Sequence, residues 1–150
     1  MLTDDDRAGI VAILSLGIHM TTILLAHAGT DDRRMYAEYL RAFGFRVKEV
    51  ATTDAALSEA SSCRLLVTGL LVPGSMDGVE LIRCVRARDA SLPILVVTAC
   101  AVERIREAAR AAGCTQLLLK PCFPERLIEA VWHLLDTPHE HRQILLRSSR

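Results

Sequence analysis

The amino-acid sequence predicts an α/β protein: a doubly wound three-layer sandwich, with helices on both faces of a five-stranded parallel sheet. Short apolar runs alternate with helical segments along the 150 residues. Strands that are separated by helices pair in parallel, and right-handed crossovers then place helices on both faces of the sheet. The chain is 51% hydrophobic, and a chain of this length buries about 68–70% of its unfolded surface, which predicts one folded domain.

The expected strands are apolar runs with turn signals on either side. Residues 23–26 and 65–68 lack polar alternation, as strands buried on both faces do, whereas residues 45–50 alternate with a period of two. Leu92-Pro93 introduces a fourth run at 94–98, and Gly113 precedes a fifth at 117–119.

The expected helices begin at capping residues and end at glycine or proline. Residues 31–43 form an amphipathic helix that Gly44 ends, and Thr53 or Asp54 caps a short helix to residue 60. The remaining helices are expected at 77–88, where Asp77 is the cap, at 101–112 before Gly113, and at 125–135 before Thr137-Pro138.

The pattern divides the chain into three parts: an N-terminal extension at 1–19, a domain at 20–136 and a tail at 137–150. Asp4-Asp5-Asp6 can cap a short helix in the extension. The alternative is that Met20 is the true start, because the regular pattern begins directly after it.

Composition excludes several classes of protein. Eighteen basic and eighteen acidic residues leave no global field that attracts nucleic acid or an anionic membrane. The apolar stretch at 10–18 is about half as long as a membrane span and follows an acidic start, unlike a secretory signal. Five cysteines without regular spacing argue for a reducing compartment, so we expect a cytoplasmic protein.

Three stretches, read together, resemble the receiver domain of bacterial response regulators. They are L-L-V-T-G-L-L-V-P-G-S-M-D-G-V-E-L from Leu65, P-I-L-V-V-T-A from Pro93, and A-G-C-T-Q-L-L-L-K-P from Ala112. The similarity extends over residues 21–135. It implies the flavodoxin-like strand order 2-1-3-4-5 of chemotaxis receivers.

The resemblance also implies a site. Receivers of this family accept a phosphoryl group on an aspartate at the tip of strand three, and an acidic pair after strand one holds Mg²⁺. A Thr or Ser ending strand four and a Lys ending strand five contact the phosphoryl oxygens. Here the acceptor position is Gly69, the acidic-pair positions are His27 and Ala28, the switch-aromatic position is Leu117, and the retained residues are Thr98, Lys120 and Pro121.

These residue types predict that the phosphorylation chemistry is lost. Phosphoryl transfer needs a nucleophilic oxygen, which Gly69 lacks, and Mg²⁺ prefers carboxylate oxygens, which His27 and Ala28 do not supply. We therefore expect a degenerate receiver with no cofactor. It would be no enzyme, because no nucleophile and base are placed together.

The expected function is phosphorylation-independent binding of a protein partner: a kinase, a regulator or another receiver. The protein would then be a monomer or a weak homodimer, with no nucleic-acid or membrane partner. In the family, the face formed by helix four, strand five and helix five commonly binds partners. Here that face would present Val102, Ile105, Arg106, Arg110 and the outer side of the last helix.

Two alternatives remain open. The pocket could be rebuilt as a small-ligand, metal or redox sensor around His27, Thr98, Cys100 and Lys120, with Cys122 nearby. The protein could instead be a single-domain regulator that is phosphorylated at an off-pattern residue.

Lys120 carries a separate expectation. An unpaired buried cation is costly, so Lys120 should reach solvent or pair with Asp31 or Asp32 across the pocket mouth. Both aspartates fall in the first helical turn, where negative charge is favourable whether or not they approach the pocket.

Overall fold

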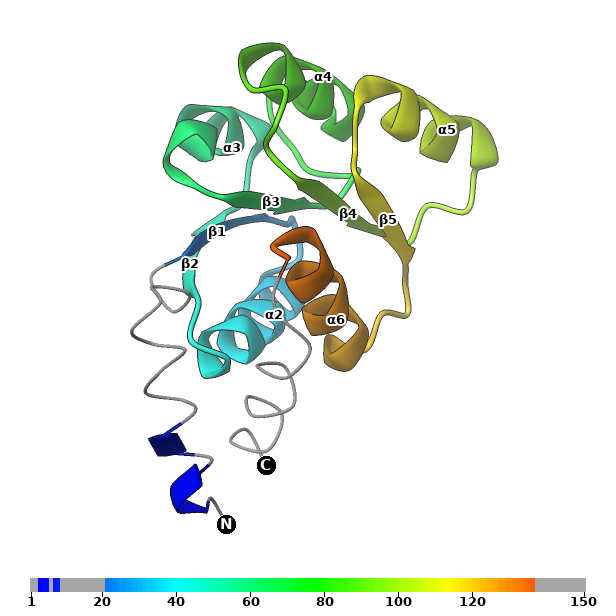
Figure 1. The fold of residues 1–150 in the computed structure, drawn as a ribbon. Coiled ribbons are helices and arrows are strands. Elements are labelled where there is room, and N and C mark those ends of the chain that lie inside the picture. The colour runs from blue at the N-terminus through cyan, green and yellow to red at the C-terminus, as the bar shows by residue number, and fades with distance from the viewer. Residues whose placement is uncertain (1–2, 6, 9–20, 137–150) are drawn as a thin grey trace.

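The predicted strands form one parallel sheet. The structure is a computed structural model that describes residues 3–5, 7–8 and 21–136. The strand order is β2-β1-β3-β4-β5, which confirms the predicted fold class (Figure 1). The strands are β1 (Thr22–Ala26), β2 (Arg46–Val50), β3 (Leu65–Thr68), β4 (Ile94–Thr98) and β5 (Gln116–Leu119).

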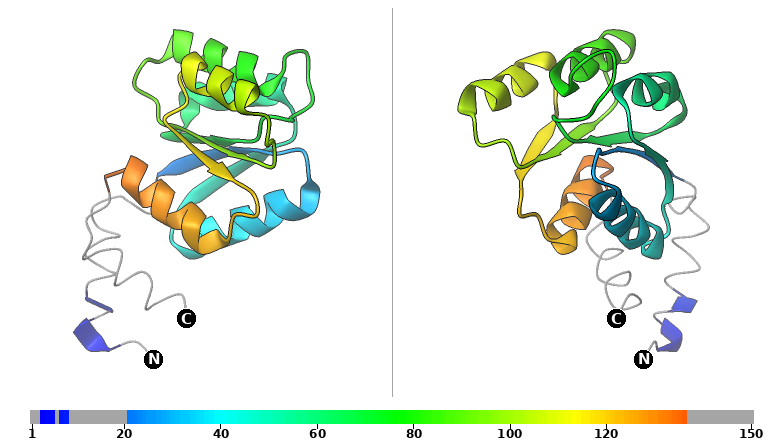
Figure 2. Two further views of the ribbon diagram at one scale, coloured as in Figure 1. Left: turned by 90° about the vertical axis from the view of Figure 1, so that its right-hand side faces the viewer. Right: turned by 180° about the vertical axis from the view of Figure 1, so that it is seen from behind.

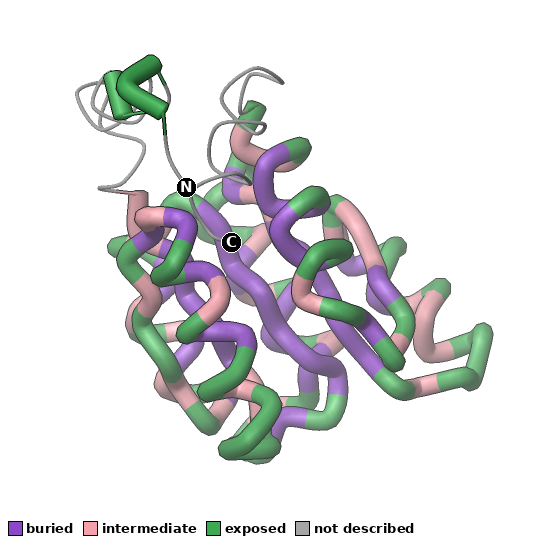
Figure 3. Tube along the Cα trace, turned by 90° about the horizontal axis from the view of Figure 1, so that it is seen from below, coloured by how far each residue is buried: buried purple, intermediate pink, exposed green. Residues whose placement is uncertain are grey.

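Helices cover both faces of the sheet, as Figures 1 and 2 show. On one face lie α3 (Thr53–Glu59), α4 (Gly78–Arg88) and α5 (Glu103–Ala112), and on the other lie α2 (Thr30–Ala42) and α6 (Pro124–Leu134). A short 3₁₀ turn, η2 (Ala60–Ser62), follows α3. The central strands lie between the helical layers and are buried along their length (Figure 3).

Two hydrophobic clusters, one for each face, hold the layers together. Because successive strand residues point to opposite faces, Leu24 packs under α3 and α4 while its neighbour Leu25 packs under α2 and α6. On the second face, the Trp132 ring of α6 is fully buried and meets Phe43 edge-on, with ring centroids 5.3 Å apart. Burial of this kind stabilises the fold by about 25 cal/mol per Å² of apolar surface.

Local signals set most helix ends. The Asp77 carboxylate accepts the Glu80 N–H at 2.8 Å and so caps α4 as predicted. Gly113 ends α5 with a φ of 116°, a left-handed conformation that favours glycine. The predicted start of α5 at residue 101 is wrong, because Val102 has extended backbone and the helix begins at Glu103.

The two edges of the sheet differ in chemistry. β2 carries Arg46, Lys48 and Glu49, and its charges are paired with flanking helices: Lys48 with Glu59 at 2.6 Å and Glu49 with Arg41 at 3.2 Å. β5 at the other edge is a run of leucines after Gln116, of which Leu119 is 45% exposed.

The predicted tail at 137–150 lies outside the described residues, and so does the predicted extension at 1–19 except for residues 3–5, 7 and 8. Among the described residues, no helix has the length and apolar composition needed to cross a membrane.

Candidate functional site

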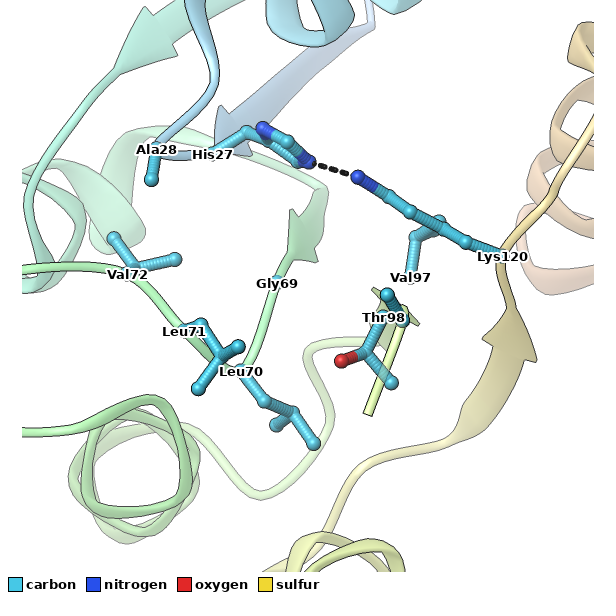
Figure 4. A pocket seen from close by; sticks show the side chains of 10 residues that line it. His27, Ala28, Gly69, Leu70, Leu71, Val72, Val97, Thr98 and Lys120 are labelled. Atoms are coloured by element: carbon cyan, nitrogen blue, oxygen red, sulfur yellow. Dashed lines mark hydrogen bonds between the residues drawn. The ribbon is translucent and has the colours of Figure 1, made fainter. Parts of the chain in front are cut away.

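The carboxyl ends of β1, β3, β4 and β5 surround a cavity of about 110 Å³ (Figure 4). In open parallel sheets, ligands bind at this edge. The walls are mostly apolar; the lining residues are His27, Ala28, Gly69, Leu70, Leu71, Val72, Val97, Thr98, Ala99 and Lys120. The structure therefore brings together five of the residues predicted from the sequence: His27, Ala28, Gly69, Thr98 and Lys120.

Gly69 lies at the centre of this cavity, directly after β3. Its N–H donates to the Ala26 carbonyl at 3.1 Å, which continues the pairing of β3 with β1. A Cβ atom at this position would lie 3.6 Å from Val72 Cγ2 and 3.7 Å from the Val97 carbonyl oxygen, which are ordinary contacts. The backbone therefore has room for a side chain where the sequence supplies none.

Thr98 supplies the only side-chain oxygen among these lining residues. The residue is 3% exposed, and its Oγ1 accepts the Cys100 N–H at 3.1 Å. Its carbonyl accepts the Lys120 N–H at 2.8 Å, so the ends of β4 and β5 are joined beside the cavity. Pro121 follows Lys120 through a cis peptide bond and does not line the cavity.

Lys120 crosses from the end of β5 toward the end of β1 and forms one wall of the cavity (Figure 4). Its Nζ lies 2.6 Å from His27 Nε2 and donates to Asp32 Oδ2 at 2.9 Å. The pairing of Lys120 with a first-turn aspartate is confirmed, and Asp32 is the partner. Hydrogen bonding to Lys120 lowers the pKa of the Asp32 carboxyl.

The His27 ring can accept a hydrogen bond from Lys120 only when Nε2 carries no proton. An ammonium group carries donors and no acceptor, so the Lys120 contact depends on this form of the ring. Nδ1 in turn accepts the Gly29 N–H at 3.0 Å and lies 3.3 Å from the Gly29 carbonyl oxygen. A neutral imidazole carries one ring proton, so Nδ1 and Nε2 cannot both be acceptors. Partial burial first, and then the charge of Lys120, lower the pKa of His27 below 6.5, so the ring is neutral at neutral pH.

Helix α2 holds this arrangement in place. Arg33 Nη1 donates to the His27 carbonyl at 2.8 Å, and Arg33 Nε lies 3.5 Å from Glu49 on β2. Tyr36 presents its ring edge-on to the imidazole with centroids 6.2 Å apart, and its hydroxyl donates to the Cys122 carbonyl at 3.3 Å. Burial raises the pKa of Tyr36 to about 12, so this hydroxyl keeps its proton.

The cysteines do not assemble with His27. Cys122 is buried outside the cavity lining, and burial raises the pKa of its thiol, which disfavours the thiolate that binds metals. Cys100 is half-buried and also outside the lining. Within the described part of the chain, no three His, Cys, Asp or Glu side chains are grouped so as to hold a metal ion.

The predicted partner surface is smaller than expected. Val102 is 48% exposed and Arg110 is exposed, but Ile105 packs partly buried against the core under α4. Arg106 is an ion-pair partner of Glu103, and its side chain is only 18% exposed. Ile105, Ala109 and Ala112 have the i, i+4, i+7 spacing of a buried helix face, a signal that would have removed Ile105 from the surface.

Sequence reasoning missed some exposed apolar residues. Leu119 ends the edge strand β5 and is exposed, whereas Leu117 is half-buried against the core. Leu71 and Phe123, on the loops after β3 and β5, are 75% and 69% exposed. The sequence could have indicated the exposure of Leu119, because this residue ends a strand at the edge of the sheet. It held no comparable signal for Leu71 or Phe123.

Comparison with known proteins gives a consistent result. Residues 23–132 match the family described as the response regulator receiver domain. The chain is 26% identical to a cyclic di-GMP phosphodiesterase of Thermotoga maritima and 29% identical to the transcriptional regulatory protein ResD of Bacillus subtilis, over 85% and 77% of its length. These matches span 35% and 48% of the two relatives, so the chain covers half or less of each.

A solved structure has the same fold. The receiver domain protein (CheY-like) from Methanospirillum hungatei superimposes with a TM-score of 0.73 at 22% identity, covering 82% of this chain and 97% of that one.

Proposed function

Because the chain belongs to the response regulator receiver family, we propose that it is a two-component signalling protein that has lost its phosphoacceptor and acts by binding another protein. One observation carries the proposal: Gly69 occupies the tip of β3 inside the cavity and has no nucleophilic atom. The other lining residues offer a single hydroxyl, that of Thr98, which already accepts a backbone hydrogen bond.

The donor set does not fit Mg²⁺. This ion prefers six oxygen ligands in octahedral geometry, commonly including one or two carboxylates. The acidic-pair positions hold an imidazole and a methyl group, and the imidazole Nε2 faces the Lys120 ammonium group. The carboxylate of Asp32 is also engaged by Lys120, at 2.9 Å. A cation would have to displace Lys120 from both partners.

The proposed partner surface lies where α5 begins and β5 ends. Val102 and Leu119 supply exposed apolar groups there. Arg110, in the last turn of α5, is exposed and reaches back to Glu103 at 3.1 Å. So small an apolar area supports a weak or transient interface, with the protein itself a monomer or weak homodimer. We propose no enzymatic activity; the phosphodiesterase named above is a longer protein, of which 35% is matched.

The test is intact mass after incubation with Mg²⁺ and acetyl phosphate. The native protein and Gly69→Asp should both gain nothing, because the variant restores the nucleophile without the metal ligands. Adding His27→Asp and Ala28→Asp should restore labelling. The same triple variant with Asn in place of Asp at position 69 is the control. Labelling of the native protein would overturn the proposal and favour an off-pattern acceptor.

Binding needs its own experiment. Native protein that is immobilised without a phosphodonor should retain a partner, and Val102→Glu with Leu119→Glu should release it. Leu71→Glu, on a different loop, is the matched control. A partner that binds only after the phosphodonor is added would contradict phosphorylation-independent recognition.

The cavity itself supports one alternative, a small-ligand or metal sensor. Its volume of about 110 Å³ and its mostly apolar walls could admit a few atoms of a ligand. A thermal-shift screen with nucleotides and divalent metals separates the two functions, because a protein-binding module should show no shift.

A further inference from the structure

A second cavity, of about 220 Å³, lies between the ends of two helices on one face of the sheet. α3 and α4 run side by side there (Figure 1). Because each helix returns the chain to the start of the next strand, both end at the amino edge of the sheet, opposite to the Gly69 cavity. The apolar part of the lining consists of Leu57, Ala60, Val85 and Leu92. The last three belong to the hydrophobic core, so this cavity has rigid walls.

Two opposite charges stand at the rim of this interhelical cavity, on consecutive residues. Arg88 is the last residue of α4 and Asp89 is its C-cap, and both are exposed. Among the described residues Arg88 has neither an ion-pair nor a hydrogen-bond partner, so it does not pair with Asp89. The nearby Arg86 differs, because its guanidinium donates to the carbonyls of Gly113, Asp89 and Ala90. Arg88 is therefore a cation that a ligand in the cavity can reach.

Asp89 is held in place as an anion. Its Oδ1 accepts the Ser91 hydroxyl at 2.8 Å and the Ser91 N–H at 2.9 Å, and these bonds lower the pKa of the carboxyl. A carboxylate has about four lone-pair positions, so it can accept further donors. The C-terminal end of α4 adds partial negative charge on the same side, which favours a cationic group there.

We propose that the interhelical cavity binds a free amino acid with an apolar side chain. Its carboxylate pairs with Arg88, its ammonium group pairs with Asp89, and its side chain enters the apolar part of the cavity. A simple anion would meet the charge of Asp89 and a simple cation that of Arg88, whereas a zwitterion satisfies both.

The size of the cavity agrees with this ligand. A volume of about 220 Å³ corresponds to about seven water molecules. Pockets for drug-sized ligands hold about 300–1,000 Å³, so a single amino acid fits better than a nucleotide. The inference does not rest on the proposed function: labelling of the native protein by acetyl phosphate would overturn that function and leave the amino-acid site intact.

The test is a titration of the native protein with L-leucine, followed by NMR. The amides of Ala60, Val85 and Leu92 should shift and saturate at millimolar ligand. Isocaproate lacks the ammonium group of leucine, isoamylamine lacks its carboxylate, and glycine lacks its side chain. Each should bind weaker by about fivefold or more.

Three results of this titration would overturn the proposal. The first is the absence of a saturable shift with leucine. The second is an isocaproate, isoamylamine or glycine affinity equal to that of leucine. The third is a set of shifts confined to Gly69 and Thr98, which would place leucine in the other cavity.

Two variants locate the site. Arg88→Gln removes a charge without disturbing a partner, so it should weaken leucine by about fivefold and leave isoamylamine, which has no carboxylate, unchanged. Arg83→Gln, exposed on the same helix and outside the lining, is the matched control and should bind leucine as the native protein does. Ala60→Leu should fill the cavity and abolish binding. If Ala60→Leu fails to fold, Arg88→Gln still decides: native affinity for leucine in that variant would overturn the proposal.

Discussion

The N–H of Gly78 donates to the Leu70 carbonyl at 3.3 Å, and no side chain could fit between the two residues. A Cβ on Gly78 would lie 2.5 Å from the Leu70 oxygen and 2.7 Å from the Leu70 Cα. This close approach ties the first turn of α4 to the loop that begins at Gly69. The loop that lines the cavity is therefore fixed at both ends.

Gly78→Ala should destabilise the protein by about 1–3 kcal/mol, because the added methyl group must displace backbone and not a flexible side chain. Gly69→Ala is the matched control, since its Cβ would meet only ordinary contacts. That variant should be neutral or stabilise by up to about 1 kcal/mol, through the unfolded state. Urea unfolding of both variants measures the difference; equal losses would contradict the close approach.

Stability should fall on acidification because of His27. Its pKa is lowered in the folded protein, so between that pKa and 6.5 the unfolded chain binds more protons, and the free energy of unfolding falls as the pH drops through this window. Below the folded pKa the loss levels off. His27→Gln should have a flatter profile. Denaturant unfolding at a series of pH values shows this, and parallel profiles for the two proteins would refute it.

Arg86→Lys should cost about 1–3 kcal/mol. The guanidinium donates to the Gly113 carbonyl at 2.7 and 3.2 Å and to the carbonyls of Asp89 and Ala90 at 3.1 and 3.0 Å. A lysine ammonium group cannot span these acceptors, so the end of α5 would separate from α4. Arg88→Lys, exposed on the same helix, should change thermal stability little. Equal effects of the two substitutions would contradict this role.

Asp32→Asn should cost at most about 1 kcal/mol, since the pair with Lys120 is half in solvent. The clearer effect should be on His27: the negative charge of Asp32 raises the pKa of His27, so its removal should lower that pKa further. An NMR titration of the variant measures the shift, and Asp31→Asn is the control. A rise in the His27 pKa would count against the arrangement.

The fold was predictable because its signals are local. The strands at 65–68 and 94–98 were predicted with the bounds that the structure has, since continuous apolar runs between turn residues leave little freedom. The caps at Asp77 and Gly113 were predictable for the same reason. The start of α5 was not, because the residues from Ala101 permit helix and only the extended backbone at Val102 ends it.

The site was only partly predictable. The order of the strands placed Gly69, Thr98 and Lys120 at one edge, and the cost of a lone cation required a carboxylate partner. The contact of Lys120 with His27 joins residues 93 positions apart and depends on how two loops direct their side chains. The choice of Asp32 over Asp31 depends on the helical phase of α2, which sequence spacing alone leaves open.

The unlike edges of the sheet limit how this protein can aggregate or stack. A strand that approached β2 would have to strip water from Lys48 and Glu49, whose charges are engaged with Glu59 and Arg41. The leucines of β5 impose no such cost. Among the strands that the structure describes, growth of the sheet is therefore favoured at β5 only. Two copies joined edge to edge through β5 would present β2, with its paired charges, at both outer edges of the described sheet.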